Sequence, residues 1–114
     1  MSIPQDQIEE LVSVIPNVRQ ASEGGVTYFL LPQLDMPLGC TPQQVDSLLC
    51  PVPRDGYQSR LFFAEMVNGG PSRNWHVQGN IRILDRNWYA ISWQTRSGLR
   101  LIQMIRAHLD ALKP

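Results

Sequence analysis

The two cysteines of this chain are the residues that could act as nucleophiles. A cysteine nucleophile attacks as the thiolate, and its substrate must be able to reach it. Cys50 lies in an apolar run, where strand alternation places it on the same face as Leu48 and Val52. Free cysteine is among the most buried residue types, so we predict that Cys50 fills the core. Cys40 follows a glycine in a loop segment, which leaves both a structural and a reactive role open.

Histidine is the other residue type that could carry acid–base chemistry. His76 follows a glycine-rich segment and could orient a carbonyl group, whereas His108 falls in a helical pattern and is expected to be structural. No histidines, cysteines or carboxylates occur at metal-ligand spacing, and no glycine loop has the lysine of a phosphate-binding motif. The sequence therefore predicts no metal and no cofactor. It leaves Cys40, Cys50 and His76 as weak catalytic candidates.

The elements that position these residues follow from hydrophobic periodicity. Helical spacing predicts one helix over about residues 3–15 and a last helix that begins after a cap at Ser97. Strands are predicted for residues 26–31, 44–52 and 59–67, the last with Leu61 and Phe63 on one face and Phe62 on the other, and short extended pieces with a loop for residues 75–93. These elements predict an α+β fold, with an antiparallel meander of about four strands flanked by an N-terminal and a C-terminal helix.

The composition is that of an ordinary globular protein. A chain of 114 residues suits a single domain over residues 1–114, because two cores of half this size would bury too little apolar surface. No apolar run approaches the roughly 20 residues that a membrane helix needs. The N-terminal segment has acidic residues where a secretory signal would be basic. We therefore expect a cytoplasmic protein with free thiols and no membrane association.

Charge is unevenly distributed along the chain. Residues 1–53 hold six acidic residues and one arginine, whereas residues 54–114 hold nine basic and four acidic residues. If the halves segregate in space, two faces of opposite potential would steer a protein partner; otherwise both are simply solvated. Nucleic-acid binding is disfavoured because the basic residues form no cluster interleaved with aromatic ones.

Aromatic and arginine side chains alternate in one short window. The window holds Trp75, Arg82, Arg86, Trp88, Tyr89, Trp93 and Arg96. Aromatic residues bury the most area per side chain, so a small domain needs them in its core. Tryptophan, tyrosine and arginine are also the usual anchors of protein interfaces. Core filling is one interpretation, and a protein-binding surface that includes Arg82, Arg86 and Trp88 is the other.

Five motifs occur in an order that resembles a known family. They are LPQLDMPLG, VDSLLCPVPRDGY, LFFAE, RNWYAISW and GLRLIQMIRAHL. Together they look like the bacterial ubiquitin-conjugating-enzyme-like family E over roughly residues 25–112. PRDGY is similar to the proline-rich turn before the third strand of ubiquitin-conjugating folds, although Gln58 stands where such folds usually have proline. The resemblance implies a reduced ubiquitin-conjugating fold in a bacterial pathway that handles a ubiquitin-like protein.

The resemblance also implies where an active relative would carry its modifier. Enzymes of this superfamily hold the modifier as a thioester on a cysteine that follows a histidine and precedes a tryptophan. The stretch from His76 to Trp88 looks like that region, and Arg82 stands at the position of the cysteine. Arginine cannot form a thioester. Strand alternation turns Arg82 away from the face of Ile81 and Ile83, so we predict that its guanidinium is exposed.

These expectations leave three functions open. The first is a non-catalytic module that binds a ubiquitin-like protein or its activating enzyme. The second is an active conjugating enzyme that uses Cys40 or Cys50 as its thioester carrier. The third is an interaction domain unrelated to such modifiers.

Overall fold

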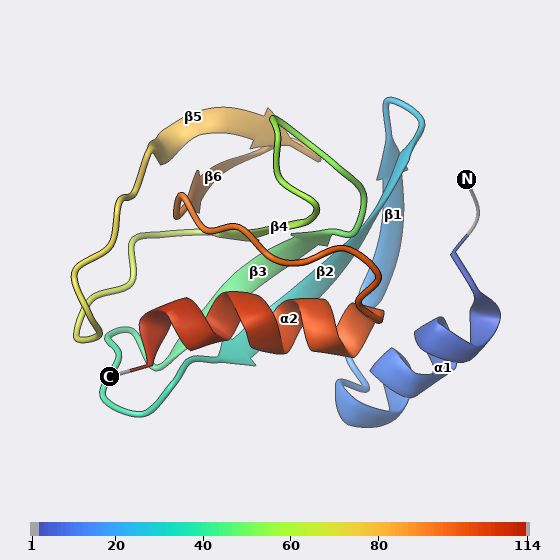
Figure 1. The fold of residues 1–114 in the computed structure, drawn as a ribbon, viewed down its shortest axis with the longest axis horizontal. Helices are drawn as coiled ribbons and strands as arrows, with labels where there is room; N and C mark the ends of the chain where they lie inside the picture. The colour runs from blue at the N-terminus through green and yellow to red at the C-terminus, as the bar shows by residue number, and fades with distance from the viewer. Residues whose placement is uncertain (1–2, 114) are drawn as a thin grey trace.

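The structure, a computed structural model, describes residues 3–113 and has a helix at each end of the chain with strands between them (Figure 1). The elements are α1 (Gln5–Val14), β1 (Arg19–Glu23), β2 (Val26–Asp35), β3 (Gln44–Cys50), β4 (Arg60–Phe63), β5 (Val77–Ile83), β6 (Arg86–Ala90) and α2 (Leu101–Leu109), followed by a 3-10 turn, η1 (Asp110–Leu112). The α+β class with two flanking helices is confirmed. No helix among residues 3–113 has the length and apolar character that a membrane span requires.

The sheet differs from the expected four-stranded meander. It has six strands in the order β1-β2-β3-β4-β6-β5, and every neighbouring pair is antiparallel. The sequence RQASE of β1 lacks the apolar alternation that predicts a strand, and most of the strand is exposed. After β4 the chain crosses to the sheet edge as β5 and returns as β6 between β5 and β4. This crossing cannot be inferred from residue alternation alone.

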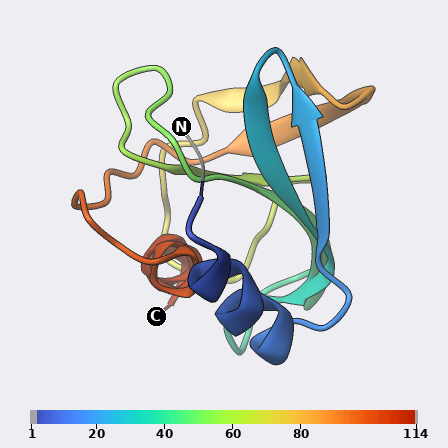
Figure 2. The same ribbon diagram turned by 90° about the vertical axis from the view of Figure 1, so that its right-hand side faces the viewer.

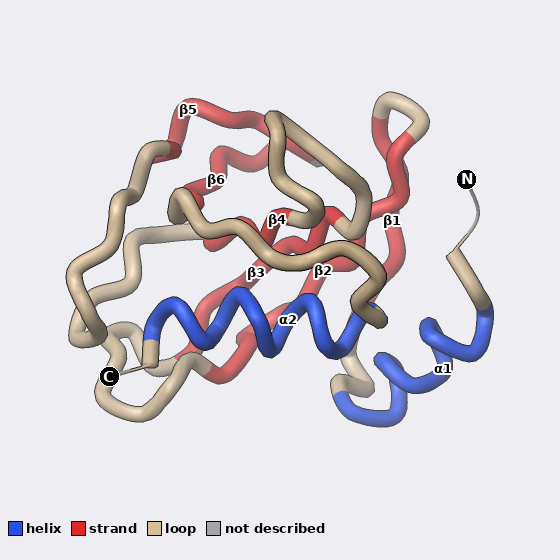
Figure 3. Tube along the Cα trace, in the orientation of Figure 1, coloured by secondary structure: helices blue, strands red, loops and turns tan. Residues whose placement is uncertain are grey.

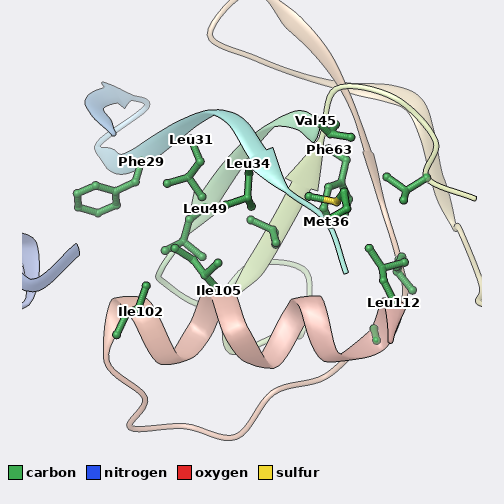
Figure 4. Close-up of a cluster of buried hydrophobic side chains, with 14 of the residues drawn as sticks. Phe29, Leu31, Leu34, Met36, Val45, Leu49, Phe63, Ile102, Ile105 and Leu112 are labelled. Atoms are coloured by element: carbon green, nitrogen blue, oxygen red, sulfur yellow. The ribbon is translucent and has the colours of Figure 1, made fainter. Parts of the chain in front are cut away.

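Strand alternation sends one set of side chains towards the helices. The set includes Phe29 and Leu31 of β2, Leu49 of β3, and Leu61 and Phe63 of β4. They pack against Leu11 of α1 and against Leu101, Ile102 and Ile105 of α2, as Figure 4 shows in part. The predicted alternation in β4 is confirmed, since Leu61 and Phe63 face the helices and Phe62 faces the other way. Both helices therefore cover the same face of the sheet.

The opposite face forms a second core, because the sheet curls (Figure 2). This concave core contains Tyr28, Leu48, Cys50, Phe62, Val77, Ile83, Trp88 and Ala90. The curl brings the β1–β2 turn near the β5–β6 turn, where the Leu84 amide donates a hydrogen bond to the Glu23 carboxylate at 3.1 Å. Edge strands β1 and β5 thus lie close together at one end of the sheet. The result is a partly closed barrel with its own apolar interior.

The last helix begins later than predicted. Gly98 has a φ of 80° and forms a turn with Ser97, so Ser97 does not cap the helix. Arg100 is the N-cap, and its amide donates to the Gln103 side chain at 2.8 Å. The loop of residues 91–100 crosses the molecule before α2 (Figure 3).

Candidate functional site

Both cysteines are buried. Cys50, the last residue of β3, is 1% exposed, and its thiol lies 3.5 Å from the Val52 carbonyl oxygen. Cys40 is 5% exposed, and its thiol lies 3.7 Å from the Leu112 carbonyl oxygen. Burial raises the pKa of both thiols, because an apolar environment disfavours the thiolate. The predicted burial of Cys50 is confirmed, and the loop around Cys40 does not expose it.

The two thiols also lie on different faces of the sheet. Cys40 belongs to the core beneath the helices, and Cys50 belongs to the concave core. Both are free cysteines. Neither combines exposure with a lowered pKa, the two properties of a reactive cysteine.

His76 lies on the surface just before β5. Its ring stacks on that of Tyr57, with centroids 5.9 Å apart. Desolvation, with a further contribution from the charge of Arg60, lowers the pKa of His76. The ring is therefore mainly neutral at pH 7. A neutral imidazole can act as a base, but the hydrogen bonds of both thiols lead to backbone carbonyls instead.

Arg82 is exposed on β5, as predicted. The residue opposite it in the hairpin is Asn87, whose side-chain oxygen accepts a hydrogen bond from Arg82 Nη1 at 3.1 Å. Ile83 is buried in the concave core and Ile81 packs against it, so alternation leaves the guanidinium on the outer face. The side chain is held in place but remains accessible to a partner.

The other two predicted binding residues differ from each other. Trp88 is 0% exposed, and its indole N–H donates to the Ile83 carbonyl at 2.9 Å. It is a core residue with no surface for a partner, which corrects that part of the expectation. Arg86 lies over the Trp88 ring at 5.0 Å, forms an ion pair with Asp46 at 3.3 Å and leaves 41% of its side chain exposed. Arg82 and Arg86 therefore lie on opposite sides of the hairpin: Arg82 faces outward beside Asn87, and Arg86 shares the side of buried Trp88 and reaches Asp46 of β3.

His108 is structural, as expected. It is 6% exposed, and its Nε2 lies 2.9 Å from the Ser59 hydroxyl, which is itself 3.0 Å from the Thr95 hydroxyl. Burial, with a contribution from the charge of Arg60, lowers the pKa of His108 to about 4. The neutral ring thus links α2 to Ser59, which precedes β4, and through Ser59 to Thr95, which follows β6.

The structure shows two features that the sequence interpretation missed. The first is an open groove of about 520 Å³ between α2 and the preceding loop, whose lining residues include Trp93, Arg96, Arg106 and Ala107. The second is a pair of arginines, buried Arg60 and partly buried Arg54, beside the turn that joins β3 to β4. Both features bring together residues that are distant in sequence or that belong to a turn. Neither feature produces a regular residue spacing by which the sequence could have revealed it.

No set of three or more histidine, cysteine or acidic side chains within residues 3–113 could hold a metal ion. The chain matches no protein-family model, and neither the curated proteins nor the solved structures include a similar one.

Proposed function

We propose that this chain is a ubiquitin-conjugating-enzyme-like module of a bacterial pathway that handles a ubiquitin-like protein. It binds that protein or its activating enzyme and carries no thioester itself. The proposal rests on the order of the five motifs and on the chemistry available at their positions. The single observation that carries it is Arg82, an exposed arginine at the position where the resemblance implies a thioester cysteine.

The motifs fall on regular elements in the order that the resemblance implies, which supports the proposal. VDSLLCPVPRDGY contributes β3 and the following turn, LFFAE contributes β4, and RNWYAISW contributes β6. GLRLIQMIRAHL contains most of α2, which covers the sheet. The motifs thus supply strands, a proline-containing turn and a closing helix, which are the parts that the resemblance implies.

Thiol chemistry separates a binding module from an active carrier. A thioester carrier must meet the C-terminus of a folded modifier, so its sulfur has to be exposed and ionisable. Cys40 and Cys50 are both buried with raised thiol pKa values. A guanidinium at position 82 can form charge-assisted hydrogen bonds with a partner but has no transfer chemistry.

The β5–β6 hairpin offers a suitable docking surface. Its outer face carries Arg82, which Asn87 holds in place, and its inner side carries Arg86, which packs on the Trp88 ring and pairs with Asp46 of β3. Arginine side chains that are held in one conformation lose less entropy when they bind a partner. We infer that an acidic or hydrogen-bond-accepting patch of the partner meets this face.

Binding measurements test the docking surface. The ubiquitin-like protein and the activating enzyme encoded in the same genome are each titrated into the chain by isothermal calorimetry. Arg82→Glu should weaken the productive complex by about 5- to 100-fold, which corresponds to ~1–3 kcal/mol, with the fold unchanged. The matched control is Arg19→Glu, which reverses an exposed charge on β1 and should bind normally. Equal loss in both variants, or binding of neither protein by the wild type, would refute the docking surface.

A gel assay tests the absence of a carrier. The chain is incubated with the activating enzyme, the modifier and ATP, and is then run without reductant. We expect no reductant-sensitive adduct on this chain. An adduct that disappears in Cys40→Ser or Cys50→Ser would identify an active conjugating enzyme and overturn the non-catalytic assignment.

A further inference from the structure

Arg60 is an unusual buried residue. It is 1% exposed at the start of β4, and its two terminal nitrogens, Nη1 and Nη2, have no hydrogen-bond partner within residues 3–113. Arginine stays charged in proteins, and a buried charge without a partner strongly disfavours folding. An apolar side chain of similar size would be the more stable choice. The residue therefore has donors that the described part of the chain leaves free.

A second guanidinium, that of Arg54, packs on the same aromatic ring as Arg60. Arg54 Nε is also buried without a hydrogen-bond partner among the described residues, while its Nη1 donates to the Tyr28 hydroxyl at 3.1 Å. The guanidinium carbons of Arg60 and Arg54 lie 5.5 Å and 5.8 Å from the centre of the Phe62 ring. Two positive charges thus share one aromatic neighbour.

Negative charge near this pair is sparse. Asp55 lies 3.6 Å from Arg54 Nε and is 59% exposed, and Arg60 has no salt bridge within residues 3–113. Burial raises the pKa of the Tyr28 hydroxyl and of the Cys50 thiol, so both neighbours stay neutral at pH 7. The local charge is therefore positive.

Aromatic contacts satisfy only part of the Arg60 guanidinium. The Tyr57 ring centre lies 4.2 Å from Arg60 Cζ. A ring packed against a guanidinium stabilises its flat face, whereas the N–H donors lie in the plane of the group. In-plane donors are the ones that bind a carboxylate or phosphate through two parallel hydrogen bonds. The packing holds the guanidinium in position and leaves its donors available.

The cover over the site is a short surface turn. Tyr57 is held by a hydrogen bond of 2.6 Å between its hydroxyl and that of Ser92, and the adjacent Gln58 amide donates to the Gln94 side chain at 3.0 Å. Both are exposed bonds that water can replace. A small movement of this turn would therefore open a path to Arg60 without disrupting either core.

We propose that Arg60 and Arg54 form a binding site for an oxyanion, a carboxylate or phosphate group, beneath the Tyr57 ring. The free nitrogens of Arg60 donate hydrogen bonds to two oxygens of the bound group, and Arg54 Nε donates a further hydrogen bond to it. The Tyr28 hydroxyl positions Arg54, and Tyr57 closes over the bound group. This site is separate from the β5–β6 hairpin surface and does not depend on the function proposed for it.

Thermal and chemical unfolding with added anions tests the proposal. The wild type is unfolded in phosphate, in sulfate and in acetate, each matched in ionic strength by chloride. An anion that binds only the folded state should raise the folding equilibrium constant saturably, by about tenfold when its concentration is ten times its dissociation constant. Whichever of phosphate and acetate stabilises the folded state more at equal concentration identifies the preferred oxyanion. If none of the three raises stability above chloride, the proposal is wrong.

Substitution of Arg60 separates a ligand site from a structural role. Arg60→Met should be as stable as the wild type or more stable in chloride, and should lose the oxyanion effect. Arg106→Met, which removes an exposed arginine on α2, should keep that effect in full. An Arg60→Met variant that is destabilised in chloride yet keeps the full oxyanion effect would overturn the assignment.

A direct readout covers the case in which Arg60→Met does not fold. Phosphate is titrated into the wild type and into Arg54→Met while the His76 ring signals are followed by NMR, because that ring stacks on Tyr57. The wild type should show a saturable shift, and Arg54→Met should need at least several-fold more phosphate. Unchanged His76 signals in the wild type would contradict binding beneath Tyr57.

Discussion

At the scale of single residues, burial decides what the two thiols can do. Cys40 and Cys50 sit in separate cores, each with its sulfur near a backbone carbonyl. A thiol in such a place behaves as a small apolar side chain. Its reactivity then depends on how often the surrounding structure opens rather than on its own nucleophilicity.

Thiol labelling measures this directly. In the native protein, both cysteines should react with an aromatic disulfide reagent at least about 100-fold more slowly than in urea-unfolded chain, because only opened molecules expose them. Single Cys→Ser variants assign the two rates. Fast labelling of either thiol under native conditions would show that its burial is not maintained in solution.

His108 should make the protein sensitive to acid. Its pKa is about 4 when folded, below the ordinary value of 6.5, so the unfolded chain binds a proton that the folded chain excludes. The stabilisation by the neutral ring is complete above pH 6.5 and falls as the pH drops from there towards 4. At pH 5 the loss amounts to about 2 kcal/mol.

Urea unfolding at pH 7 and pH 5 checks this prediction. The wild type should lose more stability between the two pH values than His108→Gln, by about 2 kcal/mol, since glutamine cannot take up the proton. His76 has a lowered pKa as well and is present in both proteins, so its effect cancels. Identical losses would mean that His108 is not buried in neutral form.

At the scale of elements, α1 packs on the sheet mainly through Leu11, with Ile8 partly buried beside it. Leu11 is its only buried side chain within the helix and is 0% exposed, whereas Val12 and Val14 are 43% and 51% exposed. Arg100 adds surface ion pairs to Asp6 at 2.9 Å and to Glu10 at 3.0 Å. Exposed ion pairs contribute little, so apolar packing must hold the helix on the sheet.

Alanine substitution separates these contributions. Leu11→Ala should lower the free energy of unfolding by about 2–5 kcal/mol, because it leaves a cavity between α1 and the sheet. Val12→Ala, one residue along the same helix, should change stability by less than about 0.5 kcal/mol. If chemical denaturation showed the same loss of unfolding free energy in Leu11→Ala and Val12→Ala, α1 would not be packed through Leu11.

At the scale of the whole molecule, the uneven charge along the chain serves partly to join its halves. Three acidic residues of the N-terminal half, Asp6, Glu10 and Asp46, pair with Arg100 and Arg86 of the C-terminal half. These contacts oppose a separation into one acidic and one basic face. The electrostatic potential that could steer a partner over long range is therefore weaker than the charge distribution along the sequence indicates.

The single sheet also makes both cores depend on the C-terminal helix. Leu101, Ile102, Ile105 and Leu112 cover the helix-facing side of the strands whose other side lines the concave core. A chain that ends at Ser97 should therefore lose cooperative thermal unfolding and dispersed NMR signals. A chain that ends at Leu112 should keep both. A cooperative transition in the shorter chain would mean that the curled sheet folds without α2.

Local patterns in the sequence already determined much of this protein. Alternation predicted that Cys50 is buried, that Arg82 is exposed and that Leu61 and Phe63 oppose Phe62, because a strand turns successive side chains to opposite faces. Apolar spacing likewise predicted both helices, since one face must pack on something. These properties depend on near neighbours in the chain.

Only the tertiary structure decided the remainder. Polar β1 is a strand because β2 pairs with it, and Trp88 is buried because the sheet curls over it. Within residues 3–113 the terminal nitrogens of Arg60 have no hydrogen-bond partner, and only the tertiary arrangement around them decides this. Strand pairing, curvature and the partners of a buried charge join residues far apart in the sequence. No local period encodes such contacts, because their energy depends on which surfaces meet.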